Sequence, residues 1–133
     1  MPCRVVIADD AEGVRSLTRE LLNEHDDITV VGEAIDGVEA VAAVLAFHPD
    51  VLLLDLSMPR MDGLQVLFHL RAQETDTRIV VLSGFARDRM GPLLLEAGAS
   101  SYLEKGASPE VLRRAVLDAC GQEPQSELAR RAS

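Results

Sequence analysis

The chain has 133 residues, a length that suits one domain, and 47% of them are hydrophobic, enough to form a buried core. Its formal net charge of −9 disfavours direct binding to nucleic acid or to an anionic membrane surface. No apolar run approaches the length of a membrane-spanning helix, and no signal peptide is visible. The two cysteines, Cys3 and Cys120, lie at opposite ends of the sequence, which argues against a disulfide framework or a metal knuckle and fits a reducing cytoplasm.

Five short apolar runs alternate with longer segments of helical period. The runs are rich in Val, Ile and Leu and nearly continuous, which is typical of strands that are covered on both faces of a parallel sheet. An alternation of strand and helix predicts an open α/β sheet with right-handed crossovers. The five predicted strands are Cys3–Ala8, Ile28–Gly32, Val51–Leu54, Ile79–Leu82 and Ser101–Leu103.

The segments between these runs place apolar residues on one helical face. The predicted faces are Val14, Leu17, Leu21 and Leu22; Val38, Val41, Ala42 and Leu45; Leu64, Leu67 and Phe68; and Val111, Leu112, Ala115, Val116 and Ala119. Asp36 is the predicted N-cap of the second helix, Gly98 ends the fourth, and Ser108-Pro109 opens the last.

The fourth helical segment, residues 86–97, contains Gly91-Pro92. Proline inside a helix removes a backbone donor and crowds the preceding turn, so we expect a short helix from Pro92 or a break at Gly91. Residues 1–120 are expected to form the domain, because residues 121–133 have no apolar period and are typical of a solvated tail or the start of a linker.

Polar side chains follow four of the five predicted strands. Asp9-Asp10, Asp55, Ser83-Gly84 and Glu104-Lys105 stand where the first, third, fourth and fifth strands end. The carboxyl ends of parallel strands meet at one edge of the sheet, and ligands bind there in open α/β folds. Three converging aspartates repel one another, and a hard cation such as Mg²⁺ would relieve that repulsion.

A carboxylate beside Mg²⁺ and a lysine can be a nucleophile toward a phosphoryl group and form an aspartyl phosphate. Asp55 is the best candidate, because it ends the central strand, where packing on both faces would hold its position. Lys105 adds a mobile positive charge that could pair with a carboxylate or contact a phosphoryl oxygen.

Five short motifs in this order resemble the receiver domain of two-component response regulators, over about residues 4–119. They are Ala8-Asp9-Asp10, Leu54 to Pro59, Asp62-Gly63-Leu64, Leu82-Ser83-Gly84 and Tyr102 to Lys105. The resemblance implies a flavodoxin-like, doubly wound parallel sheet with strand order 2-1-3-4-5 and five helices; the strand order of receivers of this kind is well known.

The resemblance also implies roles for the residues at the strand ends. Asp55 would be the phosphoacceptor, Asp10 and Asp55 would bind Mg²⁺ directly, Asp9 would act through water, and Ser57 would offer its main-chain carbonyl. Ser83 and Lys105 would contact phosphoryl oxygens, and the small Gly84 would leave room beside them. Tyr102 would be the switch aromatic, turning inward as Ser83 moves. We further expect Phe85 and Ser57 to screen the phosphoryl group from attacking water.

Two features depart from the family pattern. Many receivers follow the lysine with a cis proline, whereas Gly106 follows Lys105 here, a variation familiar among regulators with a LuxR-type helix-turn-helix output. The Gly91-Pro92 pair falls in a helix that, with the fifth strand and last helix, forms the signalling face of the family. A homodimer through that face is expected.

The leading hypothesis is therefore a phosphorylation switch that accepts a phosphoryl group from a sensor histidine kinase. DNA would be a partner only of a separate effector domain beyond residue 133. A pseudo-receiver, which binds partners without phosphotransfer, is the main alternative. An aspartyl-phosphate phosphohydrolase is less favoured, because Ser57 stands where such enzymes have a second aspartate. A flavin-binding protein is disfavoured by the lack of tryptophan and of a hydroxyl-rich loop after the first strand.

Overall fold

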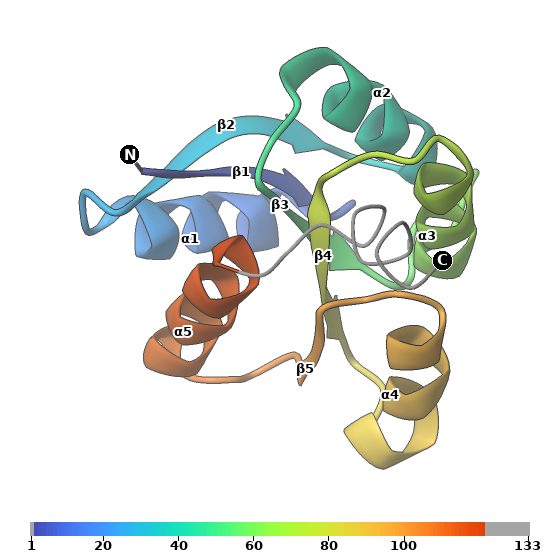
Figure 1. The fold of residues 1–133 in the computed structure, drawn as a ribbon. Coiled ribbons are helices and arrows are strands. Elements are labelled where there is room, and N and C mark those ends of the chain that lie inside the picture. The colour runs from blue at the N-terminus through green and yellow to red at the C-terminus, as the bar shows by residue number, and fades with distance from the viewer. Residues whose placement is uncertain (1, 122–133) are drawn as a thin grey trace.

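A computed structural model describes residues 2–121 and shows strands and helices in strict alternation (Figure 1). All strand pairs are parallel, and the sheet order is β2-β1-β3-β4-β5, so the predicted doubly wound fold is confirmed. The elements are β1 Cys3–Ala8, α1 Glu12–Asn23, β2 Ile28–Ala34, α2 Gly37–Phe47, β3 Val51–Asp55, α3 Gly63–Ala72, β4 Arg78–Ser83, α4 Arg87–Glu96, β5 Ser101–Glu104 and α5 Pro109–Cys120.

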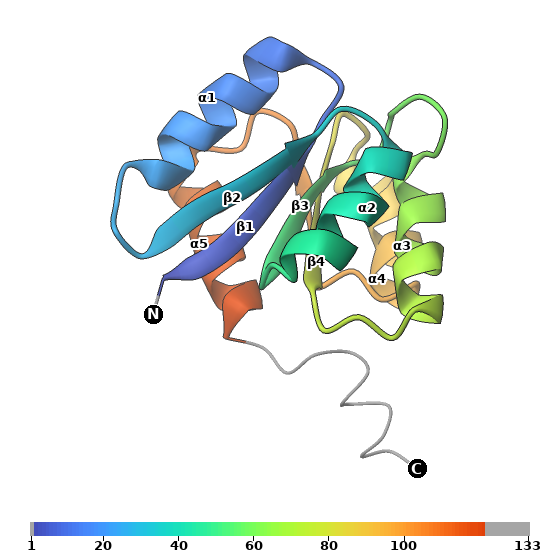
Figure 2. The ribbon, with the colours of Figure 1, turned by 90° about the horizontal axis from the view of Figure 1, so that it is seen from above.

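The sheet separates two helical layers. Figure 2 shows α1 and α5 on one face and α2, α3 and α4 on the other. Successive side chains of the central strand β3 enter the two cores in turn: Leu52 and Leu54 pack with the α2–α4 layer, and Val51 and Leu53 pack with α5. Every residue of β3 is buried, so packing from both sides fixes the carboxyl end of this strand, where Asp55 lies.

The capping residues lie where the sequence predicts them. The Asp36 side chain accepts a hydrogen bond from the Glu39 N–H, and Ser108 accepts one from the Val111 N–H. Gly98 follows the end of α4 with a φ of +114°, a conformation that favours glycine. A further cap, Asp62 with Gln65, forms a capping box at the start of α3 and so ends the loop that follows Asp55.

Helix α4 contradicts the prediction of a break, because it runs from Arg87 to Glu96 with Pro92 inside it. Pro92 is the sixth of the ten residues of α4 and lies on the exposed side of the helix, so the carbonyl that loses its partner can bond to water. Gly91 precedes it and has no Cβ to clash with the proline ring. Burial of Leu94 then holds the helix against the sheet.

The predicted helical faces are only partly buried. Leu22, Val41, Leu67, Leu112, Val116 and Ala119 are in the core, but Val14, Leu17, Val38, Leu45, Phe68 and Val111 are exposed. Each helix packs against only one face of the sheet. The strip of its surface that reaches the core is therefore narrower than the set of apolar residues predicted for that helix. Several apolar side chains are thereby left on the surface.

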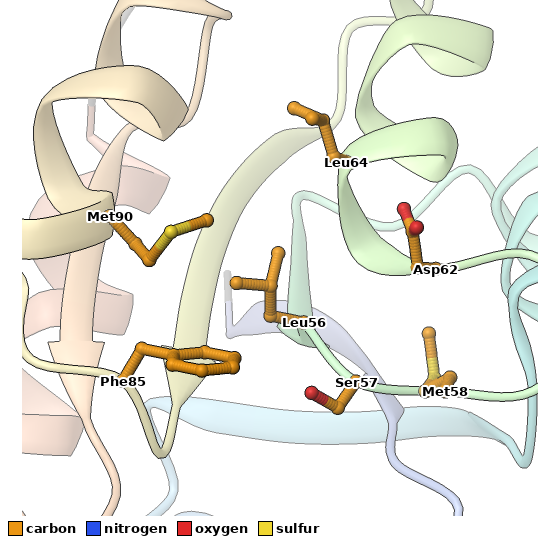
Figure 3. A pocket seen from close by; sticks show the side chains of 7 residues that line it. All are labelled: Leu56, Ser57, Met58, Asp62, Leu64, Phe85 and Met90. Carbon is orange, nitrogen blue, oxygen red and sulfur yellow. The ribbon is translucent and has the colours of Figure 1, made fainter.

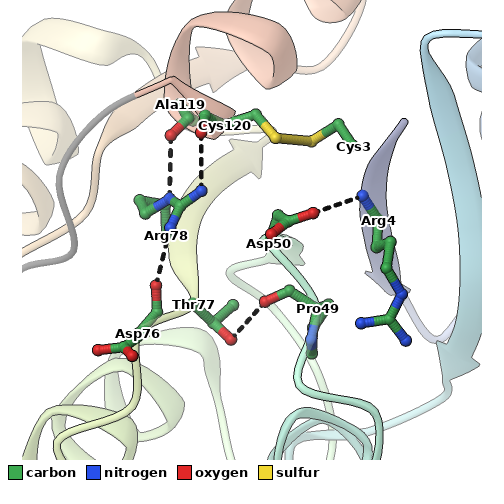
Figure 4. The surroundings of a disulfide bond; sticks show 9 residues. All are labelled: Cys3, Arg4, Pro49, Asp50, Asp76, Thr77, Arg78, Ala119 and Cys120. Atoms are coloured by element: carbon green, nitrogen blue, oxygen red, sulfur yellow. Dashed lines mark hydrogen bonds between the residues drawn. A yellow bond between two sulfur atoms is a disulfide. The ribbon is translucent and has the colours of Figure 1, made fainter. Parts of the chain in front are cut away.

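The cysteines also contradict the prediction, because Cys3 and Cys120 form a disulfide (Figure 4). Cys3 begins β1, and Cys120 is the last residue of α5. Because α5 runs antiparallel to the strands, its last residue lies at the edge of the sheet where the strands begin. The 117-residue separation in sequence hides this proximity.

No helix among residues 2–121 is long and apolar enough to cross a membrane. The predicted tail, apart from Gly121, lies outside the described residues.

Candidate functional site

Three aspartates meet at the carboxyl edge of the sheet, as the sequence predicts. One carboxylate oxygen from each of Asp9, Asp10 and Asp55 lies within 4.8 Å of the others. Asp9 and Asp55 are buried, whereas Asp10 is exposed to solvent. This set of closely spaced oxygens with one open side matches the ligands that Mg²⁺ takes, because Mg²⁺ combines one or two carboxylates with water.

Lys105 reaches the same site from the end of β5. Its Nζ lies 3.3 Å from Asp55 Oδ1 and 3.7 Å from Asp9 Oδ2. The Lys105 N–H donates to the Ser83 carbonyl, so the backbone of the lysine is fixed to the end of β4. The predicted convergence of the ends of β1, β3, β4 and β5 is therefore present.

The charges at this site shift two pKa values. Burial raises the pKa of the Asp55 carboxyl above its ordinary value of 3.8. The charge of Asp9 adds to that rise, while the Ser57 N–H and the Lys105 ammonium lower the pKa without cancelling it. Burial alone would lower the pKa of Lys105, but the charges of Asp55 and Asp9 raise it above 10.5. Lys105 is therefore held charged beside a carboxylate that is short of compensating positive charge.

The loop after Asp55 is tightly anchored. The Ser57 N–H donates to Asp55 Oδ1 at 3.2 Å, and the Gly63 N–H donates to the Leu56 carbonyl. On the far side of the loop, Arg60 forms an ion pair with the buried Asp36 carboxylate at the start of α2. These contacts hold the Ser57 backbone beside Asp55.

Ser83 and Tyr102 are both linked to the backbone of Phe85. The Phe85 N–H donates to Ser83 Oγ at 3.1 Å, and the Tyr102 hydroxyl donates to the Phe85 carbonyl at 2.8 Å. Ser83 and Tyr102 are completely buried, so the tyrosine points inward in this structure. A movement of the Ser83 hydroxyl would therefore act directly on the segment that leads into α4.

An apolar groove of about 480 Å³ lies between the β3–α3 and β4–α4 connections (Figure 3). Phe85 and Met90 line one side, and Leu56, Ser57 and Leu64 line the other. Phe85 is 40% exposed, and the Arg89 guanidinium lies 5.6 Å from the centre of its ring. The ring and Ser57 thus share the rim of one groove, which is the arrangement that the screening hypothesis requires.

Two glycines complete the site. A Cβ at Gly84 would meet no other atom of residues 2–121 within 4 Å, so open space lies beside this residue. Gly106 has a φ of +97°, which favours glycine, and the described residues contain no cis peptide bond. The loop after Lys105 therefore turns through a glycine rather than through a cis proline.

The sequence reasoning missed two arginines that support this site. Arg15 donates through Nη1 to the Asp9 carbonyl at 2.8 Å and through Nε to Glu33. Arg60, described above, anchors the loop after Asp55. The only available signal for Arg15 was its place in the first turns of a helix directly after Asp9-Asp10, where a cation can reach back to the strand end.

The family model of the response regulator receiver domain matches residues 5–117. The chain belongs to this family.

Relatives of this receiver domain include transcriptional regulators. The transcriptional regulatory protein YhcZ of Bacillus subtilis is 42% identical over 109 residues, which cover 82% of this chain and 51% of that protein. The nitrate/nitrite response regulator protein NarL of Escherichia coli K12 is 37% identical over 122 residues, 92% of this chain and 56% of that protein. The chain thus spans about half the length of these relatives.

Solved structures agree with the fold. The signal receiver domain of NarL from Mycobacterium tuberculosis superposes with a TM-score of 0.86 and 37% identity, and the match covers 91% of this chain and 98% of that one. A LuxR-family two-component response regulator from Aurantimonas has a TM-score of 0.86 and 26% identity, with both chains fully covered.

Proposed function

We propose that this receiver domain accepts a phosphoryl group on Asp55 from a sensor histidine kinase. The observation that carries the proposal is the position of Lys105 Nζ, 3.3 Å from Asp55 Oδ1, in a site with three clustered aspartates. An Asp55 oxygen attacks the phosphorus of the kinase phosphohistidine, the P–N bond breaks, and the histidine leaves and takes up a proton. Lys105 and the Ser83 hydroxyl then contact phosphoryl oxygens.

Mg²⁺ is the proposed cofactor. Asp10 and Asp55 would bind it directly, Asp9 through water, and Ser57 through its main-chain carbonyl. The metal would neutralise charge on the phosphoryl group during transfer. Two observations support a Mg²⁺ site here: the cluster of three carboxylates, and the pKa of Asp55, which is raised by burial and by the Asp9 charge. A bound cation would supply the missing positive charge.

The proposed signal passes from Ser83 to the face formed by α4, β5 and α5. If Ser83 Oγ turns toward a phosphoryl oxygen, it leaves the Phe85 N–H, and the segment that Tyr102 holds by the Phe85 carbonyl must rearrange. That segment leads into α4. The result is a population shift between two arrangements of the domain.

A homodimer through this face is part of the proposal. Leu93 on α4 and Val111 on α5 are about half exposed, and a groove between β5 and α5 has Glu110, Arg114 and Asp118 at its margin. Exposed apolar residues with charges of both signs suit a symmetric contact. The domain would work in the cytoplasm, with DNA bound only by an effector domain outside this chain.

The test of phosphotransfer is intact mass after incubation with acetyl phosphate and Mg²⁺. The parent chain is expected to gain one HPO₃, whereas Asp55→Asn and a metal-free sample gain none. Asp26→Asn is the matched control, because Asp26 is an exposed aspartate outside the site. No adduct on the parent, together with no transfer from a phosphorylated histidine kinase, would favour the pseudo-receiver alternative.

Dimerisation has its own test. Sedimentation velocity should show that phosphorylation increases self-association and that Val111→Asp abolishes the increase. Phe68→Asp on α3 is the control, because Phe68 is equally exposed but lies outside the proposed face. Equal loss in both variants would contradict the proposed interface.

A further inference from the structure

The only two cysteines of the sequence meet at the edge of the sheet opposite the aspartates. Cys3 and Cys120 are 117 residues apart, yet their Cα atoms lie 6.2 Å apart and their sulfur atoms are bonded. This Cα separation is within the usual range for a disulfide. The bond joins the first residue of β1 to the last residue of α5 (Figure 4).

The disulfide is added to a site that is already held together by other contacts. Arg78, at the start of β4, donates to the carbonyls of Ala119 and Cys120 at 3.1 and 2.8 Å, and so caps the end of α5. On the other side, the Asp50 carboxylate accepts from the Arg4 N–H, and the Cys3 N–H donates to the Asp27 carbonyl. The backbone around both cysteines is therefore positioned without the covalent bond.

This arrangement favours a reversible bond over a bond that the fold depends on. The two cysteines pack with the same apolar core, between the sheet and α5, so the folded chain keeps their thiols together after reduction. Cys3 is 3% exposed, whereas Cys120 is partly exposed, so a small reagent in solution reaches Cys120 first. In a reducing compartment, disulfides that form are usually transient and redox-sensing.

We propose that Cys3 and Cys120 are a redox-reversible pair that sets how firmly α5 is fixed to β1. Oxidation proceeds by exchange with the disulfide of a low-molecular-weight thiol. The Cys120 thiolate attacks one sulfur of that disulfide, forms a mixed disulfide and releases one small thiolate. The Cys3 thiolate then attacks the Cys120 sulfur and releases the second. The two cysteines lose two electrons to the reagent, and their two protons pass to the released thiolates.

The disulfide lies where it can control the position of α5, the helix that follows Lys105. Helix α5 begins at Pro109, four residues after Lys105, and ends at Cys120, after which the chain continues to residue 133. In the oxidised form the end of α5 is covalently fixed to the sheet. In the reduced form the hydrogen bonds from Arg78 and the core packing remain, so the end of the helix opens more readily.

The first test uses the full chain in buffers with graded ratios of reduced to oxidised glutathione. Samples are quenched in acid, alkylated with N-ethylmaleimide and weighed by mass spectrometry. The expected result is a single transition between a form with two alkylated thiols and an intramolecular disulfide with none. C3A and C120A, which each keep one thiol, should show no intramolecular product. Mixed disulfides are expected to accumulate in these variants but not in the parent chain.

The second test measures what the bond does to α5. Hydrogen exchange in the last turn of α5 should be slower in the oxidised chain, and the melting temperature should be higher by roughly 10 °C. Arg78→Met should speed exchange at this site mainly in the reduced chain. The double variant C3A/C120A should fold and show no response to the redox buffer. Neither readout depends on phosphorylation, so failure here is distinct from failure of the acetyl phosphate experiment.

Several outcomes would overturn the proposal. These are two free thiols at every glutathione ratio, a disulfide that is reduced only after unfolding, disulfide-linked dimers, or equal α5 exchange in the two forms. Because Cys3, Asp50 and Cys120 place ligand atoms within 4.8 Å of one another, metal content is also measured. One bound metal ion that keeps both cysteines reduced would assign the pair to metal binding instead.

Discussion

Replacing Asp55 by Asn is expected to stabilise the metal-free domain, even though it removes the proposed phosphoacceptor. The pKa of Asp55 is raised by burial and by the Asp9 charge, so the charged carboxylate is less favourable in the folded chain than in the unfolded chain. Asn removes that charge and keeps an oxygen that can accept the Ser57 N–H.

The size of this stabilisation can be worked out from the distances of Asp55 to Asp9 and to Lys105. Carboxylate oxygens of Asp9 and Asp55 lie within 4.8 Å of each other. At an effective dielectric constant of about 20, two like charges at that distance repel by about 3 kcal/mol. Lys105 offsets part of this from 3.3 Å, but its side chain is 37% exposed. Because solvent screens Lys105, its attraction to Asp55 contributes only about 1 kcal/mol. We expect a net gain of about 1–2 kcal/mol, or about 5 °C in melting temperature.

The assay is urea unfolding followed by circular dichroism, for the parent, Asp55→Asn and Asp26→Asn, between neutral pH and about pH 4. Because the folded pKa of Asp55 lies above 3.8, protonation favours the folded parent chain, and the stabilisation is lost as pH rises through the folded pKa. The advantage of Asp55→Asn should therefore be largest at neutral pH and shrink as pH falls toward 3.8. Mg²⁺ should also reduce the stability advantage of Asp55→Asn, because it should stabilise the parent chain more than the variant.

A destabilised Asp55→Asn variant at neutral pH would refute the reasoning, because it would mean that the attraction to Lys105 outweighs both burial and repulsion. An equal gain in stability from Asp26→Asn would also refute the reasoning, because that variant lowers the net negative charge by the same amount at an exposed position. That result would trace the effect to overall charge.

Three further predictions concern neighbouring residues. Lys105→Ala should slow phosphorylation of Asp55 by acetyl phosphate about 100-fold, because it removes the cation that we propose contacts the phosphoryl oxygens; an unchanged rate of mass gain would contradict that role. Tyr102→Phe should lower the free energy of unfolding by about 1 kcal/mol, because the hydrogen bond to the Phe85 carbonyl is lost, and urea unfolding will measure it. Phe85→Ala should speed hydrolysis of the phosphorylated chain by opening the groove that it shares with Ser57, and no change in the decay of the phosphorylated mass would count against screening.

The carboxyl-edge site could be predicted because its residues follow the ends of buried strands. Asp9-Asp10, Asp55 and Lys105 are each next to an apolar run, and parallel topology alone brings such positions together. The sequence does not show how the site is supported. Arg15 contacts the Asp9 carbonyl, and its place just after Asp9-Asp10 is the one sequence signal for that contact. Arg60 pairs with Asp36, which is 24 residues earlier, and no sequence spacing predicts that pair.

The disulfide and the continuity of α4 were not predicted, for different reasons. Spacing rules for cysteines look for near neighbours, whereas Cys3 and Cys120 are joined by the fold, through a strand start and an antiparallel helix end. The topology contained this signal, since both residues belong to the same edge of the predicted sheet. In α4, the Gly91-Pro92 pair predicts a break, but a glycine before the proline avoids a clash with its ring, and burial of Leu94 holds the helix against the sheet.

Helix α5 runs from the carboxyl ends of the strands to their amino ends. A change in its position can therefore couple the phosphorylation of Asp55 to the oxidation of the cysteines. Its N-terminus follows Lys105 at the aspartate edge, and its C-terminus carries Cys120 at the opposite edge. If phosphorylation and oxidation both favour the same position of α5, each must raise the equilibrium constant of the other by the same factor. The prediction is therefore reciprocal: phosphorylation of Asp55 should shift the glutathione ratio at which the disulfide forms. Oxidation should shift the phosphorylation equilibrium with acetyl phosphate in the same direction and by the same factor. No shift in either equilibrium would show that α5 does not couple the two ends of the strands.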